Sequence, residues 1–445
     1  MRTKARHAEV LVVGAGPAGM AAAIAAATCN KSVLVLDDNA AAGGQIWRKG
    51  LEGTPKRAKP DARRSRQTVM REAFEASGAE LLAGRRVVDA PRPGMLLTVV
   101  DTVEGPVQES FSWERLILAT GARERLLPFP GWTLPGVFGA GGLQALVKGG
   151  YDVRGKRVVV AGTGPLLVAV AAHLQQRGAT VVCVAEQAPL GQLMPFVAGL
   201  WSHPAKLYEG IRYGAALAGA PYRVGWWPVA VEKDATGMRV RLTDGKRTLV
   251  ESCDLVACGF HLVPNSELAE LLGCRFNGDA VDVDDQQRTS VAHVFCAGEP
   301  TGIAGLDAAL VQGEIAGLAA AGQAQALAGL DRRRAKERAF GERLNAAFRL
   351  RPEVCSLAAA DTLVCRCEDV SYARLQEHSG WTQAKLQTRC GMGPCQGRIC
   401  GPAVRSLFGW RAGSVRPPIF PIPISAFGSN DNESLEEVAT FQETE

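Results

Sequence analysis

The chain has 445 residues, of which 47% are hydrophobic and 50 are glycine, and its formal net charge is +5. A polypeptide of this length and composition folds into two to four globular domains with ample core. The small net charge and the scattered basic residues, with no continuous basic stripe interleaved with aromatics, argue against nucleic-acid binding.

The twelve cysteines bear on the cellular compartment. The basic start MRTKARHAEV precedes an apolar run that lacks a small-residue cleavage site in a suitable place, so we expect no signal peptide. We therefore expect a cytoplasmic protein, with peripheral association at the inner membrane as a variant of that location. In a reducing compartment, grouped cysteines favour a metal or redox site over structural disulfides.

The first unit near the N-terminus is a strand, a glycine-rich turn, a helix and a second strand. The apolar run 9–13 leads into GAGPAG, an alanine-rich helix follows to about Cys29, and VLVLD at 33–37 is the second strand. The uncharged stretch from Val10 to Cys29 is long enough to span a bilayer. Because its glycines and proline gather in one short loop, and the same plan recurs around GTGPLL, we interpret it as a βα unit.

GAGPAG has the spacing of a dinucleotide-binding turn. Gly14 permits the tight turn, Gly16 lets a pyrophosphate approach the backbone, and Gly19 lets helix and strand pack closely. Asp37 ends the second strand, where a carboxylate can accept hydrogen bonds from a ribose, and the helix N-terminus attracts phosphates. The alternative is a glycine-rich turn that binds nothing. The predicted first nucleotide site contains Gly14, Gly16, Pro17, Ala18, Gly19 and Asp37.

The segment AAGGQIWR at 41–48 comes next. Its paired glycines would bring backbone amides close to a cofactor, so Gly44 and Gln45 join the predicted site. Residues 52–66 are rich in Lys, Arg and Pro and predict an exposed loop, and a helix is predicted over about 67–77. Strands are predicted near 80–87, 95–101 and 108–111.

The segment 115–131 predicts a strand that ends in the turn ATGA, in which Thr120 and Gly121 are candidate cofactor contacts. A much later strand, VFCAG, is followed by a glycine-bounded turn and a helix, and it supplies Gly298 and Glu299 as further candidates. The chain thus interleaves one Rossmann core, a second inserted core and a return to the first.

The inserted core begins with KRVVVAGTGPLLVAVAAHLQQRGATVVCVAE at 156–186. Gly162 and Gly164 hold the first two glycine positions, but Leu167 holds the third, where it would push the helix from the strand and weaken dinucleotide binding. The second strand ends at Glu186, which would repel the 2′-phosphate of NADP and favour NAD. A working nicotinamide site and a retained fold with an empty or reshaped pocket both stay open. A helix at 204–219 and strands within 222–250 follow.

The C-terminal part begins with a charged linker helix from Arg332 to Leu350, followed by a cysteine-rich domain from Cys355 to about Trp410. RPPIFPIPI at 416–424 cannot form an interior helix, because its prolines remove donors and fix φ, so it should lie extended along a surface or a partner. The acidic end is expected to fray. The predicted boundaries are 1–125 (first dinucleotide-binding domain), 126–258 (inserted domain), 259–328 (return), 329–354 (linker), 355–412 (cysteine domain) and 413–445 (extended segment and tail).

The cysteine-rich domain has the spacing of a soft-metal site. Cys365 and Cys367 stand one residue apart in VCRCE, and Cys395 and Cys400 follow in TRCGMGPCQGRIC. Thiolates select zinc or an iron–sulfur cluster. We predict these four cysteines as the ligands, with Cys390 as the rival. Three glycines would let backbone N–H groups reach cluster sulfurs: Gly391, Gly393 and Gly397.

The CxC pair is a tighter chelate than the paired knuckles usual for structural zinc. It resembles the [2Fe–2S] domain of bacterioferritin-associated ferredoxin (BFD), although the second pair there is CxxC rather than CxxxxC. The resemblance implies a [2Fe–2S] cluster, with zinc as the alternative.

GAGPAG, the ATGA turn, GTGPLL and the CAGE return together resemble the two-dinucleotide-domain flavoprotein reductases, which implies an α/β fold with two interleaved Rossmann-like domains. In that family the first motif and its strand-end acid bind the ADP half of FAD, and the acid of the return motif meets the ribityl chain. That acid maps onto Glu299, where the family usually has Asp. The dithiol members carry a cysteine pair that this chain lacks, since Cys183 stands alone and is expected in the core.

Adding GGQIW, LATGARER, AGEPTGIAG, CRCEDV, GMGPCQGRIC and RPP, the chain resembles the α subunits of multi-subunit bacterial amine and imino-acid dehydrogenases, up to about residue 424. That group includes opine (octopine and nopaline) oxidase, D-hydroxyproline and proline dehydrogenases and hydrogen cyanide synthase, and it is similar to part of heterotetrameric sarcosine oxidase. The resemblance implies a catalytic FAD-containing β subunit, a small ferredoxin-like γ subunit and an external electron acceptor. It also implies FAD, or NAD or ATP, in the first site of this chain, and an FMN between subunits.

Three functions follow as hypotheses. The first is an electron-transferring subunit of a dehydrogenase that oxidises an opine, D-hydroxyproline or a related imino or amino acid. The second is an NAD(P)H-dependent ferredoxin-type reductase, and the third is a non-catalytic scaffold with a structural nucleotide. No catalytic residue is predicted, because the six histidines show no triad-like grouping.

Overall fold

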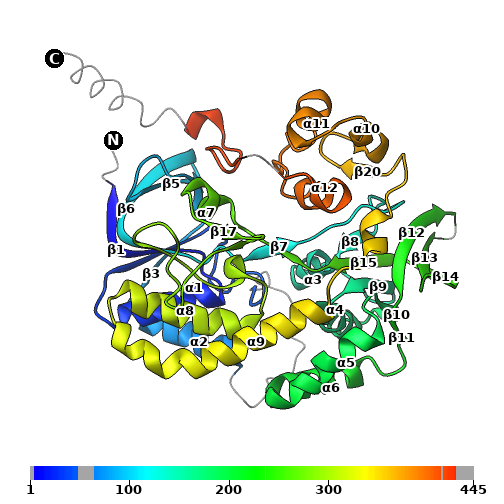
Figure 1. Ribbon diagram of the computed structural model, residues 1–445, viewed down its shortest axis with the longest axis horizontal. Coiled ribbons are helices and arrows are strands. Elements are labelled where there is room, and N and C mark those ends of the chain that lie inside the picture. Colours follow the sequence, from blue (N-terminus) through cyan, green and yellow to red (C-terminus); the bar gives the residue numbers. More distant parts are fainter. Residues whose placement is uncertain (1–4, 49–64, 236, 412–413, 427–445) are drawn as a thin grey trace.

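The computed structural model describes residues 5–48, 65–235, 237–411 and 414–426. Figure 1 shows two α/β domains side by side, with the orange C-terminal elements forming a small domain above them. Nearly all of the loop predicted over 52–66, and the acidic tail after residue 426, lie outside the described residues.

The first domain is built on a seven-stranded sheet in the order β3-β2-β1-β6-β5-β4, with β19 also paired to β6. The strands β1, β2, β3 and β19 run parallel to β6 and form the parallel part of the sheet with its C-terminal half. The strands β4 and β5 form the antiparallel part, in which β5 pairs with β6. Since β19 follows the whole second domain in the chain, the first sheet is completed only after that domain. The strands are β1 (Arg6–Val13), β2 (Val33–Asp37), β3 (Glu80–Ala83), β4 (Arg86–Asp89), β5 (Met95–Thr102), β6 (Gly105–Leu118) and β19 (Val294–Cys296).

Three of the strands predicted in this sheet are wrong in their limits. The strand predicted near 80–87 is two strands, because the chain turns at Gly84, whose φ is +73°. The strands predicted separately at 108–111 and in 115–131 are one strand, β6. It continues without a break because it changes partner, from antiparallel β5 to parallel β1 and β19.

Helices α1 (Pro17–Ala27) and α8 (Leu306–Ala320) pack against each other, and their small side chains share one core with β1 and β2. The contact is closest at two glycines of α8. A Cβ on Gly313 would lie 2.2 Å from the carbonyl oxygen of Ala18, and one on Gly317 would lie 2.3 Å from that of Ala22. This close packing fixes the position of the helix that starts at the first glycine turn.

The uncharged stretch from Val10 to Cys29 is part of a strand followed by an 11-residue helix. Among the described helices, none combines the length and the apolar character needed to cross a membrane. The helix predicted over 67–77 is α2 (Arg66–Ala76), which begins at Ser65, whose hydroxyl accepts the N–H of Thr68.

The second domain has a five-stranded parallel sheet in the order β11-β10-β9-β15-β8, and a three-stranded antiparallel sheet of β12, β13 and β14. Its strands are β8 (Val137–Gly139), β9 (Arg157–Thr163), β10 (Thr180–Glu186), β11 (Tyr222–Val224), β12 (Trp227–Asp234), β13 (Gly237–Thr243), β14 (Thr248–Cys253) and β15 (Leu255–Phe260). Its helices are α3 (Ala140–Lys148), α4 (Pro165–Gln176), α5 (Leu190–Gly199), η1 (Leu200–Ser202) and α6 (Pro204–Ala216).

Leu167 does not separate α4 from the sheet, contrary to the sequence-based expectation. Its side chain is fully buried in the core between α3, α4 and the sheet. The room comes from the neighbouring strand, because Gly259 of β15 has no side chain, and a Cβ there would lie 3.2 Å from Leu167 Cδ2. The third glycine of the motif is therefore replaced by a leucine and glycine pair that still packs closely.

An antiparallel pair, β7 (Ala122–Glu124) and β16 (Leu262–Pro264), carries the chain out of the first domain and back. Besides β19, the return passes through four further short elements before α8. These are α7 (Glu267–Leu271), β17 (Phe276–Asn277), β18 (Ala280–Val281) and η2 (Glu299–Thr301).

After η3 (Ala324–Leu330), the charged helix predicted as a linker is α9 (Asp331–Ala347), and η4 (Pro352–Ser356) leads into the cysteine domain. This domain has its own small core and contacts both larger domains. The guanidinium of Arg398 lies 3.5 Å from Glu267 in the first domain, and Trp132 Nε1 of the second domain donates to the carbonyl of Leu363 over 2.7 Å. Its elements are β20 (Leu363–Cys365), β21 (Val370–Ser371), α10 (Tyr372–Gln376), α11 (Trp381–Thr388) and α12 (Cys400–Phe408).

The proline-rich segment lies along the first domain, as predicted for an extended stretch. Residues 414–423 contain no helix, and the short η5 (Ile424–Ala426) follows. The backbone N–H of Ile419 donates to the carbonyl of Val88 in β4 over 2.8 Å, and the Ile419 side chain is buried.

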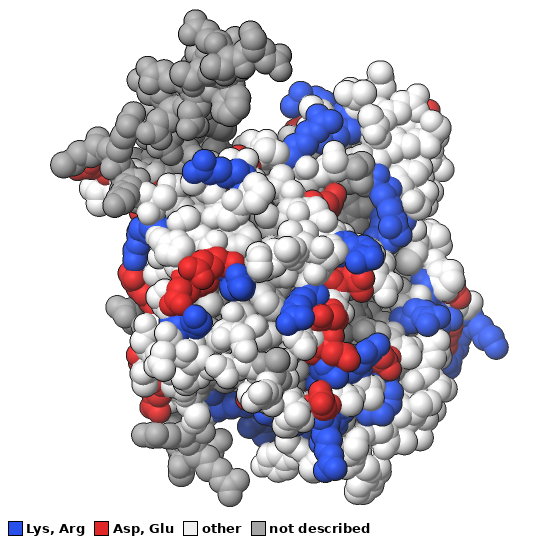
Figure 2. All heavy atoms as spheres, turned by 60° about the vertical axis from the view of Figure 1, so that its left-hand side comes forward, with Lys and Arg blue, Asp and Glu red and all other residues white. Residues whose placement is uncertain are grey.

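The surface charge is mixed. On the face shown in Figure 2, Lys and Arg side chains alternate with Asp and Glu, and the described residues of that face form no continuous basic stripe.

Candidate nucleotide and metal sites

The first glycine turn lies between β1, α1 and the end of β6, and at Gly14 and Gly19 it has no space for a side chain. Gly14 has φ +103°, and a Cβ there would lie 2.3 Å from the carbonyl oxygen of Ala119. A Cβ on Gly19 would lie 1.7 Å from the carbonyl oxygen of Gly14. The helix therefore starts close to the strand, with its N-terminal amides facing the turn as phosphate binding requires.

The second glycine segment, at Gly43 and Gly44, packs directly on the first. The N–H of Gly43 donates to the carbonyl of Ala15 over 2.8 Å, and a Cβ on Gly44 would lie 2.9 Å from the Cα of Gly16. The side chain of Gln45 is instead exposed. Of the two predicted contacts in this segment, the structure therefore brings Gly44 to the turn and leaves Gln45 at the surface.

Asp37 is buried at the end of β2 and is held in place by the turn. Its carboxylate accepts the backbone N–H of Ala15, and it accepts the backbone and side-chain N–H groups of Asn39, each over 2.7 Å. Asn39 is a residue that the sequence did not single out. This network orients the carboxylate beside the glycine turn, where the ribose of an adenine nucleotide is expected.

The ATGA turn at the end of β6 is clamped by Asn265, which the sequence did not indicate. The hydroxyl of Thr120 donates to the carbonyl of Asn265 over 2.6 Å, and the Asn265 side-chain amide donates to the carbonyl of Thr120 over 2.9 Å. Gly121 has φ +71° and open space on its Cβ side. These two hydrogen bonds join the segment that leaves the first domain to the segment that returns to it, beside the first glycine turn.

Glu299 carries a buried oxygen without a partner. Its Oε1 accepts the N–H of Gly305 over 3.2 Å, whereas Oε2 is buried and has no hydrogen-bond partner among the described residues. Burial raises the pKa of this carboxyl from 4.5 to about 7. Next to it, Gly298 has φ +83°, and a Cβ there would lie 2.8 Å from the Cβ of Ala18 in α1.

An unpartnered buried acceptor is costly unless a ligand supplies a donor. The tight glycine turn, Asp37 and the free oxygen of Glu299 therefore fit a nucleotide cofactor with hydroxyl donors along its chain. The residues that would hold it are Gly14, Gly16, Pro17, Ala18, Gly19, Asp37, Gly44, Thr120, Gly121, Gly298 and Glu299.

The raised pKa of Glu299 predicts a pH-dependent stability of the nucleotide-free protein. Because the folded state holds this proton more tightly than the unfolded chain, its contribution is fully present below pH 4.5 and is lost as the pH rises through about 7. Between pH 5 and pH 8, wild type should lose on the order of 2 kcal/mol more stability than Glu299→Gln, which cannot ionise.

Urea unfolding at both pH values measures this difference. Glu186, whose pKa is also raised to about 7 by burial, is present in both proteins and cancels in the comparison. Equal pH dependence of the two proteins would contradict the assignment of a buried, unpaired carboxyl to Glu299.

The acid of the second glycine turn is completely satisfied by the protein. Glu186 is fully buried, and its oxygens accept the hydroxyl of Thr163, the N–H of Gly164 and the N–H of Ala188 over 2.8 to 2.9 Å. Unlike Glu299, it has no free oxygen in a buried position.

The segment between α9 and η4, residues 348–351, lies over the same strand end. The side-chain amide of Gln187 donates to the carbonyl of Arg349 and accepts the N–H of Arg351, both over 3.0 Å. The ring of Phe348 packs edge-on against Phe196 at 5.3 Å between centroids. The chain itself thus covers the end of β10, where the adenosine of a dinucleotide on this turn would lie.

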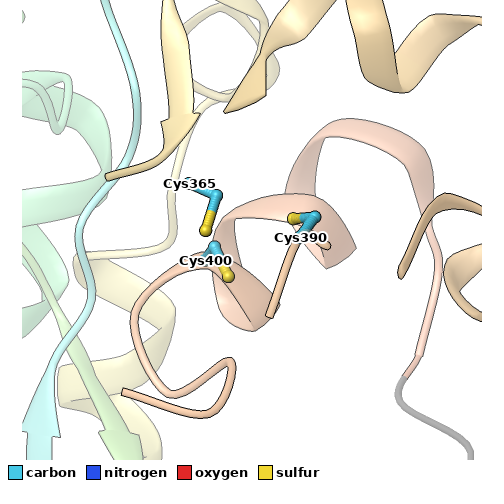
Figure 3. A group of neighbouring side chains, drawn as sticks. All are labelled: Cys365, Cys390 and Cys400. Carbon is cyan, nitrogen blue, oxygen red and sulfur yellow. The ribbon is translucent and has the colours of Figure 1, made fainter. Parts of the chain in front are cut away.

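All twelve cysteines are free thiols, and the five from Cys365 onward gather in one group. Figure 3 shows Cys365 at the end of β20, Cys390 in the loop after α11 and Cys400 at the start of α12. Their three sulfur atoms lie within 4.8 Å of one another, and all three residues are buried. Side-chain hydrogen bonds extend the group from Cys400 to Cys395 and from Cys395 to Cys367. The four predicted ligands and Cys390 therefore form one five-sulfur group.

Two of the five cysteines have a lowered pKa and favour the thiolate, whereas neighbouring thiols and burial raise the pKa of Cys367, Cys390 and Cys400. Hydrogen bonds from the thiols of Cys390 and Cys400 lower the pKa of Cys365 to about 2, and a hydrogen bond from Cys400 lowers that of Cys395 to about 5. Thiolates are the form that binds zinc and iron. The donor set therefore fits a soft metal ion or cluster, and the choice of four ligands among the five remains a prediction.

Two of the three predicted glycines lie where a side chain would collide with a residue in or beside the sulfur group. A Cβ on Gly393 would lie 2.2 Å from the Cβ of Cys367, and one on Gly391 would lie 2.7 Å from the ring of Trp381. The loop that carries Cys390 and Cys395 can pass between Cys367 and Trp381 only because these positions lack side chains.

Comparison with known proteins supports both the fold and its extent along the chain. Residues 8–326 match the family model for pyridine nucleotide-disulphide oxidoreductases. The HcnB subunit of hydrogen cyanide synthase from Pseudomonas aeruginosa is 32% identical, over 95% of this chain and 99% of its own length. One subunit of the opine oxidase from Agrobacterium tumefaciens is 31% identical, over 90% of this chain and 85% of its own length. Among solved structures, L-proline dehydrogenase from P. horikoshii aligns with a TM-score of 0.61 at 18% identity, over 96% of this chain and 80% of that one.

Proposed function

Because this chain belongs to the pyridine nucleotide-disulphide oxidoreductase family, we propose that it is the electron-transferring subunit of a dehydrogenase whose substrate is oxidised in a partner subunit. The proposed substrate is an opine, D-hydroxyproline or a related imino or amino acid. Full-length similarity to one subunit of opine oxidase and to one of hydrogen cyanide synthase supports this assignment.

The observation that carries the proposal is the pairing of two sites in one chain. A glycine cradle ends in a buried acceptor at Glu299, and a five-sulfur group lies in a separate small domain docked on both dinucleotide-binding domains. No CxxC pair follows either glycine turn in the sequence, and Cys183 in β10 is fully buried, with its pKa raised to about 12 by burial. These features favour electron transfer over dithiol chemistry.

The proposed cofactors are FAD, or NAD or ATP, in the first site and a [2Fe–2S] cluster on Cys365, Cys367, Cys395 and Cys400. A bound flavin supplies two-electron chemistry, and a cluster supplies one-electron transfer. The protein contributes the glycine cradle, the acceptor oxygen of Glu299 and a buried thiol set. An FMN between subunits, a β subunit that holds the catalytic FAD, a ferredoxin-like γ subunit and a location in the cytoplasm or at the inner membrane complete the proposal.

The alternative of an NAD(P)H-dependent reductase requires a nucleotide on the second glycine turn. The segment 348–351 and its hydrogen bonds to Gln187 argue against that function, because a dinucleotide would have to displace them. The five-sulfur group argues against a scaffold with a structural nucleotide, because that function requires no metal site.

We predict that NADH and NADPH do not reduce the purified chain, and that the complex with its partner subunits is reduced by an opine or imino acid. The test is anaerobic visible spectroscopy of the chain alone and of the complex captured from its native cells, with flavin, iron, sulfide and adenine nucleotide determined. Rapid bleaching of flavin by NADH in the chain alone would establish the reductase instead. Bound ATP without flavin, iron or zinc would favour the scaffold.

A further inference from the structure

Cys390 lies in the most buried part of the sulfur group, although the sequence marked it only as the rival of the four predicted ligands. Its relative exposure is 1%, equal to that of Cys365 and Cys400. By contrast, Cys367 is exposed and Cys395 is partly exposed. Its sulfur lies within 4.8 Å of two predicted ligands, close to the sulfur spacing of about 3.8 Å that tetrahedral thiolate coordination implies.

The position of Cys390 is set by the backbone around it. α11 ends at Thr388, its C-cap Arg389 has φ +64°, and Gly391 follows with φ +82° against the ring of Trp381. The N–H of Cys390 donates to the hydroxyl of Thr388 over 3.2 Å. Because this turn is fixed from both sides, the backbone holds the thiol toward Cys365 and Cys400 (Figure 3).

Cys395 reaches the group from a less buried turn. It is followed by two residues with positive φ, Gln396 and Gly397, and its sulfur contacts Cys400 on one side and Cys367 on the other. Cys390 and Cys395 thus approach Cys400 from different sides of one loop, Cys390 beside Cys365 and Cys395 beside Cys367.

We propose that Cys390 is a metal-binding sulfur of this site and replaces Cys395 as the fourth ligand when Cys395 is absent. The inference rests on the metal site of the proposed function. On binding, the Cys390 thiol loses its proton to solvent and forms a sulfur–metal bond, and no oxidation is involved.

The test uses the full-length chain in complex with its partners, with Cys395→Ala, Cys390→Ala and the double variant. Cys274→Ala serves as a control for the loss of a buried thiol far from the cluster, in the core of the first domain. Each protein is reconstituted anaerobically with iron and sulfide, and separately with zinc. Iron, acid-labile sulfide and zinc per chain are measured, together with the electron paramagnetic resonance spectrum of the reduced protein.

Each single variant should keep more than half of the wild-type metal, and the double variant should lose at least tenfold. The spectrum of Cys395→Ala should differ from that of wild type, because a sulfur from another position now binds. If Cys395→Ala loses as much metal as the double variant while wild type is loaded, the inference is wrong and the proposed function stands. A wild-type chain that takes up neither iron nor zinc would overturn the metal site itself.

Circular dichroism and thermal unfolding show whether each variant is folded. Should Cys395→Ala not fold, Cys395→Ser keeps the side-chain volume, and because its hydroxyl oxygen can itself bind metal, it is compared with the double variant Cys390→Ala, Cys395→Ser. Loss of all metal from a folded Cys395→Ser protein would likewise overturn the inference.

Discussion

Gly19→Ala is expected to empty the first nucleotide site, with bound nucleotide falling at least tenfold per chain. The added Cβ would lie 1.7 Å from the carbonyl oxygen of Gly14 and 3.4 Å from the Cβ of Ala119. The first of these is a backbone atom in the turn that would bind the phosphates, so no side-chain rotation relieves the clash. The start of α1 must move away from β1, and the amides that face the phosphates move with it.

α1 cannot withdraw freely, because its other side is packed against α8. There Gly313 and Gly317 already bring the two helix backbones to the distance at which a Cβ would overlap a carbonyl oxygen. The strain is therefore shared between two contacts, and we expect a loss of roughly 1–3 kcal/mol of stability.

The matched control for this change is Gly210→Ala in α6, where a Cβ would meet nothing within 4 Å. It should leave the nucleotide content unchanged and stabilise the helix by roughly 0.5–1 kcal/mol. Nucleotide released on denaturation is quantified by chromatography, and stability by urea unfolding. Normal nucleotide content in folded Gly19→Ala would show that the first glycine turn is not the binding site.

Gly393→Ala should remove most of the metal while leaving every thiol in place. A Cβ at this position would lie 2.2 Å from the Cβ and 3.3 Å from the sulfur of Cys367, and 3.1 Å from the carboxylate of Glu368. The loop of Cys395 and the loop of Cys367 must separate to accept it. Because metal–sulfur distances tolerate only a few tenths of an ångström, we expect less than a third of the wild-type iron and sulfide.

The control in the same domain is Gly401→Ala, at the first turn of α12, where nothing lies within 4 Å of a new Cβ. It follows Cys400 directly and so also tests for a general effect beside a ligand. Iron and sulfide are measured after anaerobic reconstitution, and thiols are counted in the denatured protein. Full metal content in Gly393→Ala would remove Cys367 from the set of ligands.

The local parts of the fold could be predicted from the sequence because their signals are local. Apolar runs, glycine spacing and strand-end acids located β1, α1, β2 and the equivalent elements of the second domain. The strand β6 exceeded its predicted length because its continuation depends on partners far away in the chain. The helices α3 and α5 were not predicted.

The site residues divide in the same way: those with a local signal could be predicted, and those that depend on distant contacts could not. Glycines with a steric role were identifiable, but Asn265 was not, since its function depends on a contact with Thr120 145 positions earlier. Leu167 was misjudged because the space for it comes from Gly259 on another strand. The place of Cys390 in the sulfur group likewise depends on how α11 and β20 pack, which spacing alone does not encode.

The segment 348–351 covers the second glycine turn and also tethers the cysteine domain to the rest of the chain. η4, with Val354 buried in the core of the second domain, follows it directly, and β20 with Cys365 comes soon after. Any molecule that took the place of this segment at Gln187 would therefore have to loosen the anchor of the cysteine domain. By thermodynamic reciprocity, firm docking of that domain weakens such a competitor by the same factor. A partner protein that clamps the cysteine domain would thereby also protect the chain from pyridine nucleotides, without touching the second glycine turn.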